Sequence, residues 1–356
     1  MNIDYFDYFL PDNLIANQPA EPRHSSRLMV IDRISKKLEN RKFWDIKEYL
    51  KKDDLLVFND TRVINARLYG VFSGATQSKL EILLVEKTSP AEWKIICKPA
   101  KKFKLGVEIE LIGQMGQIKG VINKIYEDEY RGIKFDKELN LKSDGLLPLP
   151  PYIKKPLDDD EKYQTVYSRN LGSIAAPTAG LHFTTELMAE IAYKQIDMVY
   201  LTLNIGPGTF KPVRVNQLDR HKMHYEKYRI DNQTLKAIAS AKSQGRRIVS
   251  VGTTTVRVLE HLATTGKLGL NEELPNNGFL DGQTNLFIYP GYKFQIVDAL
   301  ITNFHLPRST LLMLVSAFAE QVGENNDGIE LIKESYRKAV EMNYRFYSFG
   351  DAMLII

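Results

Sequence analysis

The chain contains 356 residues, of which 44% are hydrophobic and 26% charged, a composition typical of a globular protein with one large domain or two of ordinary size. Its single cysteine, Cys97, excludes an internal disulfide framework and a cysteine-only zinc site, and the longest strongly apolar run, residues 311–319, is too short to cross a bilayer. Because no basic stretch precedes an apolar one at the N-terminus, we expect a cytoplasmic protein without a membrane partner, and the net charge of +4 permits an RNA partner without demanding one.

Two different patterns follow one another along the chain. The first 60 residues contain a predicted helix at 45–52 and a predicted strand at 55–58. From 62 to 145 the sequence divides into six short strand-like runs separated by turn signals, and in residues 107–113 apolar side chains alternate with glutamates as in a half-buried strand. Six such strands predict a small antiparallel β-barrel, and the proline-rich segment 145–151 predicts a domain boundary after it.

The pattern then changes to strands alternating with amphipathic helices, which is typical of an α/β layer arrangement. Two helices, each ending at a glycine, are predicted at 231–244 and 255–265. The predicted sheet strands are 197–205, 246–252, 294–303 and 349–356. Since the first 60 residues are more similar to this part than to the barrel, we expect a mixed α/β fold, in which 1–61 and 146–356 form a discontinuous α/β domain and 62–145 is an inserted β-barrel domain.

The first segment that suggests chemistry is 173–184, a loop of small residues that includes Pro177, Thr178 and Gly180. Small residues let a ligand approach the backbone closely. His182 stands beside an aromatic residue at the end of this loop, an arrangement suited to a base next to a flat ring. The alternative is a structural imidazole bonded inside the protein.

A second segment, 248–257, is a buried-looking strand that turns at a glycine and enters a helix through three threonines. Helix N-termini present unpaired N–H groups, so we expect the start of this helix, at Gly252, Thr253 and Thr254, to receive a phosphate or a carboxylate. The segment is neither a P-loop nor a dinucleotide motif, because the glycines and lysine of those motifs are absent. The alternative is a capped helix whose threonine hydroxyls bond locally.

A third segment, 204–213, follows a predicted strand and forms a rigid glycine- and proline-rich turn at the edge of the sheet where ligands gather in α/β proteins. Its candidate binding residues are Gly206, Gly208, Thr209 and Phe210. His224 and Glu226 follow, and if both lie on one strand they share a face and allow acid–base work. The His-x-x-His spacing of His221 and His224 has no evident third ligand, so we expect no metal.

Basic residues concentrate at two places, where arginine and lysine supply affinity for phosphates. The candidate nucleic-acid contacts are Lys98, Lys101, Lys102 and Lys104 in the barrel region, and Arg23 and Arg27 near the N-terminus. Phe103, inside the lysine cluster, is expected to stack a base. The alternative is an ordinary lysine-rich exposed loop.

Taken together, the chain resembles the S-adenosylmethionine:tRNA ribosyltransferase-isomerase family over nearly its whole length. The matching pieces include FDYFLPDNLIANQP at 6–19, LLVFNDTRVINARL at 55–68, KPAKKFKLG at 98–106, GLLPLPPYI at 145–153, YQTVYSRNLGSIAAPTAGLHFT at 163–184, LNIGPGTFKPV at 203–213, MHYE at 223–226, VGTTTVRVLE at 251–260 and PGYKFQIVDALITNFHLPRSTLLMLVSAFA at 290–319. The sequence departs from the family pattern at Asn65, at Leu146 and Leu147, at Glu320, and at Asn204, where a histidine is usual. Asn204 weakens any scheme that needs an imidazole there.

The resemblance implies that the ribosyl part of S-adenosylmethionine moves to prequeuosine at the wobble position of tRNA, leaving epoxyqueuosine and releasing adenine and methionine. S-adenosylmethionine is then a co-substrate, and we expect no permanently bound cofactor. The partner is tRNA carrying prequeuosine, and we expect a monomer. Two other functions fit parts of the sequence, an RNA methyltransferase and a noncatalytic RNA-binding protein. The missing glycine-rich turn argues against the first, and the glycine- and proline-rich loops argue against the second.

We expect the ligand to bind between the two domains. The substrate-binding residues are expected to be Asn59, Asp60, Arg62, Pro177, Thr178, Gly180, Gly206, Gly208, Thr209, Phe210, Gly252, Thr253, Thr254, Arg257 and His305. As the base we favour His182, because it follows a small-residue loop, and His224 with Glu226 as its orienting partner is second. His305 precedes a predicted helix, where packing or capping is the simpler account.

Overall fold

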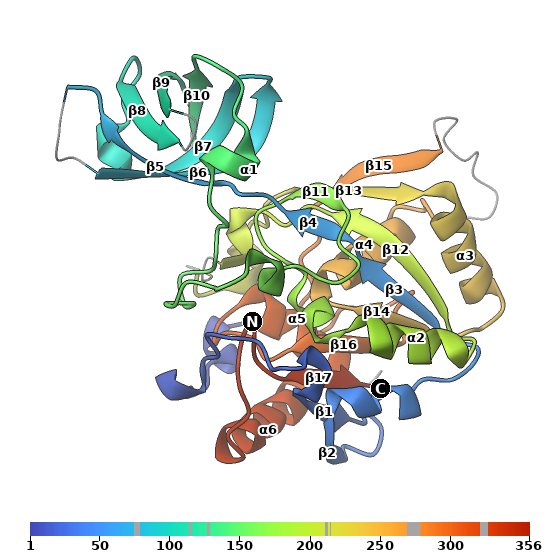
Figure 1. The fold of residues 1–356 in the computed structure, drawn as a ribbon. Helices are drawn as coiled ribbons and strands as arrows, with labels where there is room; N and C mark the ends of the chain where they lie inside the picture. The colour runs from blue at the N-terminus through green and yellow to red at the C-terminus, as the bar shows by residue number, and fades with distance from the viewer. Residues whose placement is uncertain are drawn as a thin grey trace. The chain divides into compact units, whose positions relative to one another are not determined.

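The computed structural model describes residues 1–74, 79–113, 116–126, 129–210, 213, 215–268, 278–320 and 327–356. The chain forms two compact units (Figure 1). The α/β unit comprises Met1–Arg62, Pro151–Asn170 and Ala176–Ile356, and the barrel unit comprises Val63–Pro150 and Leu171–Ala175. The expected fold class, a discontinuous α/β domain with an inserted antiparallel barrel, is confirmed. The domain bounds stated from the sequence stay a prediction.

The barrel unit is a closed sheet whose strand order is β10-β7-β6-β5-β8-β9. Its strands are β5 (Arg67–Phe72), β6 (Lys79–Ser89), β7 (Glu92–Lys98), β8 (Glu108–Gly113), β9 (Gly116–Ile125) and β10 (Arg131–Phe135), and α1 (Leu141–Asp144) follows them. Ile109 and Leu111 of β8 point into the core while Glu108 is exposed, as the alternation predicts. The expected base-stacking role of Phe103 is wrong, because this ring is 1% exposed and packs at 5.1 Å from Phe72 inside the barrel.

The α/β unit is built on a nine-stranded sheet of order β15-β13-β12-β3-β14-β16-β17-β1-β2. Its strands are β1 (Arg27–Ile31), β2 (Leu38–Lys42), β3 (Leu55–Asn59), β12 (Asp197–Leu203), β13 (Glu226–Asp231), β14 (Ile248–Val251), β15 (Phe279–Thr284), β16 (Ala299–Asn303) and β17 (Ala352–Ile355). β12, β3, β14 and β16 run parallel, so their carboxyl ends share one edge. β4 (Thr61–Val63) and β11 (Asn170–Ser173) form a separate two-stranded sheet.

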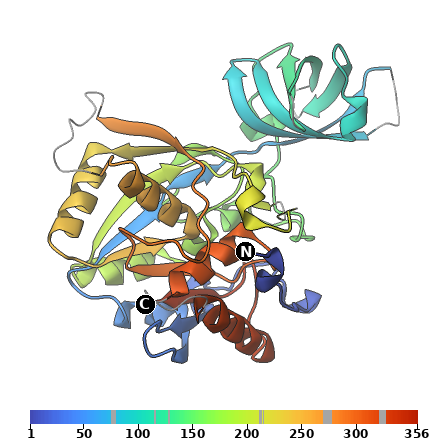
Figure 2. The ribbon, with the colours of Figure 1, turned by 180° about the vertical axis from the view of Figure 1, so that it is seen from behind.

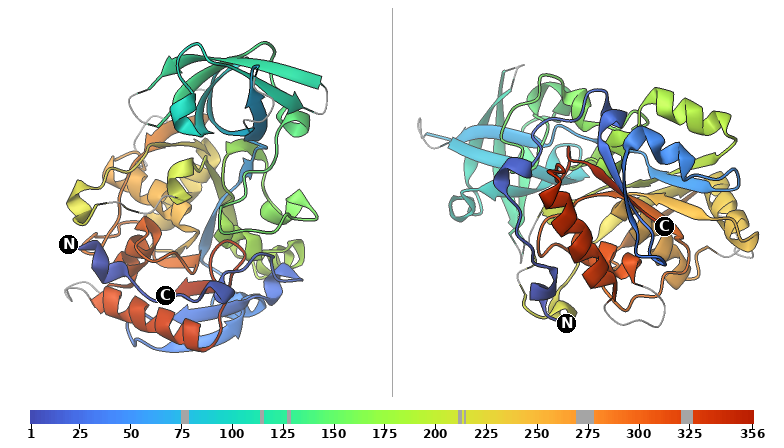
Figure 3. Two further views of the ribbon diagram at one scale, coloured as in Figure 1. Left: turned by 90° about the vertical axis from the view of Figure 1, so that its left-hand side faces the viewer. Right: turned by 90° about the horizontal axis from the view of Figure 1, so that it is seen from below.

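Helices cover both faces of the large sheet (Figure 2). In β3, Leu55 and Val57 pack into the core formed with α3 (Asn232–Ser243), α4 (Thr253–Thr264), α5 (Thr310–Ala319) and α6 (Asp327–Glu341). The alternate residues Leu56 and Phe58 pack into the core formed with η4 (Phe43–Glu48) and α2 (Thr185–Tyr193). This alternation explains why residues 55–58 of β3 are all apolar. At the N-terminus η1 (Ile3–Phe6) packs against α6 (Figure 3).

Most local predictions agree with the observed elements. α3 and α4 are followed by Gly245 and Gly266, whose φ values of 67° and 74° only glycine adopts readily. The helix expected at 45–52 is instead the 3₁₀ helix η4, which begins earlier because the Asp45 carboxylate accepts the Lys42 N–H at 3.0 Å. In the part of the chain that is described, no helix has the length and apolar character needed to span a bilayer.

The remaining short 3₁₀ helices lie in the connections between these elements. They are η2 (Asp12–Leu14), η3 (Arg23–Ser25), η5 (Ala100–Lys102), η6 (Asp160–Tyr163), η7 (Thr178–His182), η8 (Pro207–Phe210) and η9 (Leu218–Arg220). η7 and η8 contain predicted site residues, and both belong to the α/β unit.

Candidate functional site

The carboxyl ends of the parallel strands are tied together by Asn59, the last residue of β3. This side chain is fully buried, and its Oδ1 accepts the Leu203 N–H of β12 at 3.0 Å and the Thr61 N–H at 3.2 Å. Its Nδ2 donates to the Leu203 carbonyl at 3.1 Å and to Thr254 Oγ1 at 3.4 Å. Asn59 therefore sets the spacing between β3, β12 and the start of α4.

Asp60 is the centre of a second buried network. Its carboxylate accepts hydrogen bonds from Thr202 Oγ1 at 2.6 Å, from Arg169 Nε at 2.8 Å and from Asn170 Nδ2 at 3.1 Å. Arg62, two residues on, donates to Ser168 Oγ at 3.0 Å and pairs with Glu161. Both predicted binding residues thus hold the segment 161–170 against the sheet edge. Sequence reasoning missed Thr202 and Arg169.

His182 ends η7 and lies in a chain of buried side chains. Its Nδ1 is 2.8 Å from Ser26 Oγ, its Nε2 is 3.0 Å from Asn303 Nδ2, and its ring stacks on Phe43 at 4.9 Å. Asn303 Oδ1 accepts from Thr178 Oγ1 at 2.9 Å, so the network places the amide N–H on Nε2 and the imidazole proton on Nδ1. Burial, together with the charges of Arg345 and Arg23, lowers the pKa of His182 to about 3.

These contacts weaken the prediction that His182 is the catalytic base. Both ring nitrogens of His182 are engaged within the protein, and an imidazole with a pKa of about 3 is a weak base at neutral pH. Its catalytic role stays a prediction, and its surroundings favour a positioning role. Ser26 and Asn303 were missed because their relation to His182 is entirely tertiary, although Asn303 lies in the piece 290–319 that matches the family.

The loop before His182 is packed where only glycine fits. A Cβ on Gly180 would come within 1.9 Å of the Tyr167 hydroxyl and 2.9 Å of Thr165 Cγ2. Ala179 lies beside Gly252, with 3.7 Å between the Ala179 Cβ and the position of a Cβ on Gly252. The small-residue loop, which begins its helical turn after Pro177, therefore lies next to the start of α4.

The start of α4 presents backbone donors that its own helix does not use. Gly252 is the N-cap residue at a φ of 90°, and among the described residues no side chain caps the helix. Thr255 Oγ1 donates to the Val251 carbonyl at 2.9 Å, so this hydroxyl bonds locally, as the capped-helix interpretation predicts. The N–H groups of Thr253, Thr254 and Thr255 lie ahead of the first intrahelical bond, which Val256 makes to Gly252.

Glu226 and Arg257 form a buried ion pair beside this helix start. Glu226 Oε1 also accepts the Gly206 N–H at 3.0 Å, which joins the turn after β12 to α4. The expected pairing of His224 with Glu226 on one strand face is wrong, because β13 begins at Glu226 and His224 precedes it in an exposed loop. The His224 ring lies instead against Gly208, where an added Cβ would be 2.6 Å from Cδ2.

Two predicted residues follow Gly208 in η8. The backbone of Thr209 and Phe210 belongs to this helix, whereas their side chains lie outside the described part of the structure. Asn204 Oδ1 accepts a hydrogen bond from Thr61 Oγ1 at 2.9 Å. The Asn204 side chain therefore connects the end of β12 with Thr61, which follows β3.

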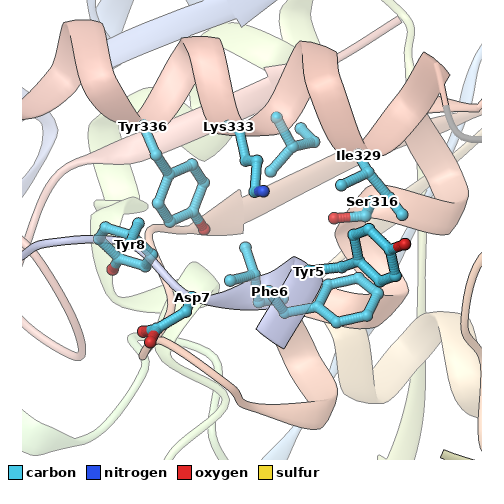
Figure 4. A pocket seen from close by; sticks show the side chains of 10 residues that line it. Tyr5, Phe6, Asp7, Tyr8, Ser316, Ile329, Lys333 and Tyr336 are labelled. Atoms are coloured by element: carbon cyan, nitrogen blue, oxygen red, sulfur yellow. The ribbon is translucent and has the colours of Figure 1, made fainter. Parts of the chain in front are cut away.

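His305 has a structural environment. Its Nε2 is 2.9 Å from Thr302 Oγ1, its backbone N–H donates to the Tyr336 hydroxyl at 2.9 Å, and burial lowers the pKa of its imidazole to about 3. Tyr336 also lines an apolar cavity with Tyr8 and Ile329 (Figure 4). This cavity measures about 10 Å³, the space needed by one water molecule, so it cannot hold a nucleoside. These contacts argue against His305 as a ligand-binding residue.

The predicted tRNA contacts divide into two groups. Arg23 donates to the carbonyls of Gln164 and Glu161 at 2.6 and 2.7 Å, and Arg27 donates to the Met342 carbonyl and stacks on Tyr344. These intramolecular partners argue against a phosphate-binding role for either arginine. The four predicted lysines of the barrel unit, Lys98, Lys101, Lys102 and Lys104, are exposed, and Lys98 Nζ lies 3.8 Å from Glu81 Oε2.

The structure brings most of the predicted binding segments to one edge of the α/β sheet. Asn59 contacts Thr254, the 175–182 loop adjoins Gly252, and Gly206 is joined to Arg257 through Glu226. Among the described residues, no cluster of three or more His, Cys, Asp or Glu side chains is arranged to hold a metal ion. That the ligand lies between the two domains stays a prediction.

Comparisons with known proteins point to one family. A family model described as "Queuosine biosynthesis protein" matches residues 3–355. Relatives named S-adenosylmethionine:tRNA ribosyltransferase-isomerase from Acetivibrio thermocellus and Thermosipho africanus are 49% and 48% identical, with 100% of each chain covered. The crystal structure of S-adenosylmethionine tRNA ribosyltransferase from Thermotoga maritima is 37% identical, has a TM-score of 0.54, and covers 99% of this chain and 100% of that one. The chain therefore belongs to the S-adenosylmethionine:tRNA ribosyltransferase-isomerase family of queuosine biosynthesis proteins.

Proposed function

We propose that this protein is a transferase that moves the ribosyl group of S-adenosylmethionine onto prequeuosine at the tRNA wobble position and isomerises it, giving epoxyqueuosine-tRNA, adenine and methionine. The observation that carries the proposal is the convergence of a small-residue loop, a helix N-terminus and the turn after β12 at one sheet edge. Full-length relatives at 46–49% identity bear the corresponding enzyme name.

The chemistry requires a base and an ordered substrate. The sulfonium acidifies the adjacent 5′ methylene, so removal of one proton starts the loss of adenine and the opening of the ribose ring. The neutral amine of prequeuosine then attacks, and methionine leaves with the sulfur electron pair. General base catalysis supplies roughly 10² to 10⁴-fold, so orientation of the substrates must contribute as well.

In this proposal one histidine transfers the proton and another helps to order the substrate. His224 is the acid–base group, because its exposed ring lies against Gly208 in the turn after β12. His182 is a positioning residue that connects Ser26 with Asn303 and so holds the 175–182 loop beside α4. S-adenosylmethionine is the co-substrate, and the scheme needs neither a metal nor a permanently bound cofactor. We also propose that the protein is cytoplasmic and monomeric.

Product analysis tests this function. Incubation with S-adenosylmethionine and an anticodon stem-loop carrying prequeuosine should release adenine and methionine in equal amounts, together with a modified RNA. A methyltransferase would instead form S-adenosylhomocysteine and no adenine. A protein that only binds RNA would consume no S-adenosylmethionine. Either of these two results, obtained with folded protein, would reject the proposal.

The exposed lysines of η5 are proposed to contact tRNA phosphates. For Lys101→Ala/Lys102→Ala, the plot of log affinity against log salt should become flatter by up to about one unit for each phosphate that is no longer bound. Lys134→Ala/Lys137→Ala removes two other exposed lysines of the same unit and serves as the matched control. Binding is measured by filter retention at several salt concentrations. An unchanged slope in the first variant would remove Lys101 and Lys102 from the RNA footprint.

A further inference from the structure

Arg257 carries a buried nitrogen without a hydrogen-bond partner. The residue is 5% exposed, and its three guanidinium nitrogens differ: Nη1 pairs with Glu226, Nε donates to the Leu286 carbonyl at 3.1 Å, and Nη2 has no partner among the described residues. A buried charged donor without an acceptor is costly, and native proteins rarely leave one unless a ligand or a water satisfies it. The geometry therefore calls for an acceptor at Nη2.

The position of Arg257 on α4 indicates where that acceptor lies. Thr253 and Thr254 precede it by four and three residues, so all three share one face of the helix, and long helical side chains incline towards the N-terminus. Glu226, which holds Nη1, also accepts the Gly206 N–H at 3.0 Å. Nη2 is thus anchored on the side of α4 where the first-turn N–H groups and the turn after β12 meet.

The charges of this cluster favour a small zwitterion over a nucleic-acid phosphate. Arg257 and Glu226 balance one another, and both side chains are 6% exposed, so a charged ligand group that reaches them must leave water and be paired there. The α-amino acid end of S-adenosylmethionine carries one carboxylate and one ammonium group. A carboxylate accepts charge-assisted bonds from a guanidinium and from helix N-terminal amides.

We propose that Arg257 binds the α-carboxylate of S-adenosylmethionine through Nη2, together with the first-turn N–H groups of α4, an inference that rests on the proposed function. Glu226 is then a positioning residue that fixes the guanidinium. The specificity that follows is for the intact amino acid end of the substrate. Decarboxylated S-adenosylmethionine keeps the sulfonium and the adenosine but lacks the group that Arg257 recognises.

The test compares these two ligands on wild-type protein and on Arg257→Gln, with and without the prequeuosine-bearing stem-loop. Wild-type protein should prefer S-adenosylmethionine over its decarboxylated analogue by about 10- to 150-fold, the range expected for one charged hydrogen bond. Arg257→Gln should lose most of that preference by binding S-adenosylmethionine more weakly, while its affinity for the analogue changes by less than about threefold. Arg257→Lys should retain part of the preference.

The controls separate this inference from folding and from the proposed function. Because Arg257→Gln leaves Glu226 without its cation, Arg257→Gln/Glu226→Gln is measured as well, and circular dichroism checks the fold of each variant. Equal affinity of the wild-type protein for both ligands overturns the inference without any variant. An unchanged preference for S-adenosylmethionine in Arg257→Gln also overturns it, and the acceptor at Nη2 of the wild-type protein is then water. Wild-type protein that neither binds S-adenosylmethionine nor releases adenine overturns the proposed function instead.

Discussion

His224→Ala is expected to lower the single-turnover rate of adenine release by about 10² to 10⁴-fold, the usual contribution of a general base. The exchange of the 5′ methylene hydrogens with solvent should fall in parallel, because both depend on the same proton transfer. Binding of S-adenosylmethionine should change little. The measurement is deuterium incorporation at that methylene beside rapid-quench analysis of adenine.

Two further variants make the assignment of the base decisive. His182→Gln keeps hydrogen-bonding groups for Ser26 and Asn303, so it should slow exchange and adenine release by the same modest factor. His221→Ala, which removes a half-buried ring packed 5.1 Å from Phe287, is the matched control and should behave as the wild type. Loss of exchange in folded His182→Gln, with near-normal exchange in His224→Ala, would make His182 the base and overturn our assignment.

The protein is expected to lose stability steeply in mild acid, because two buried imidazoles stay neutral in the folded state. The pKa values of His182 and His305 are lowered by burial from 6.5 to about 3. Above pH 6.5 neither state takes up a proton, so their contribution is complete there, and it is lost as the pH falls from 6.5 towards 3. Each histidine should lower the free energy of unfolding by about 1.4 kcal/mol per pH unit in that window.

Urea unfolding at pH 6.5 and pH 5 measures this effect. From pH 6.5 to pH 5 each histidine should cost roughly 2 kcal/mol, and carboxylates that titrate in the same range add to the total. The comparison is therefore between each variant and the wild type. Between pH 6.5 and pH 5, the free energy of unfolding of His182→Gln should decrease by about 2 kcal/mol less than that of the wild type, and the same is expected for His305→Gln. If His182→Gln and wild type lose equal free energy, His182 is not a buried neutral imidazole.

Local pattern was sufficient for much of the fold. The six barrel strands follow from alternation and turn residues, and α3 and α4 end where Gly245 and Gly266 permit a positive φ. These features depend on residues within a few positions of one another, so the sequence determines them directly. The ordered series of motifs likewise identifies the family from the sequence alone. η4 was misassigned because the start of a short 3₁₀ turn depends on a single cap.

The roles of the candidate site residues were decided by tertiary structure. His182 and Ser26 are 156 positions apart, and His182 and Asn303 are 121 apart, yet together they occupy both ring nitrogens. Glu226 binds Arg257 rather than orienting His224, because β13 begins at Glu226 and does not include His224. Sequence spacing indicates which residue types share an element, whereas burial and the partner of each polar atom arise only when distant strands meet at one sheet edge. The chain alone therefore determined the family and the fold class, and the packing of β3, β12, β14 and β16 decided which partner each polar side chain at this edge meets.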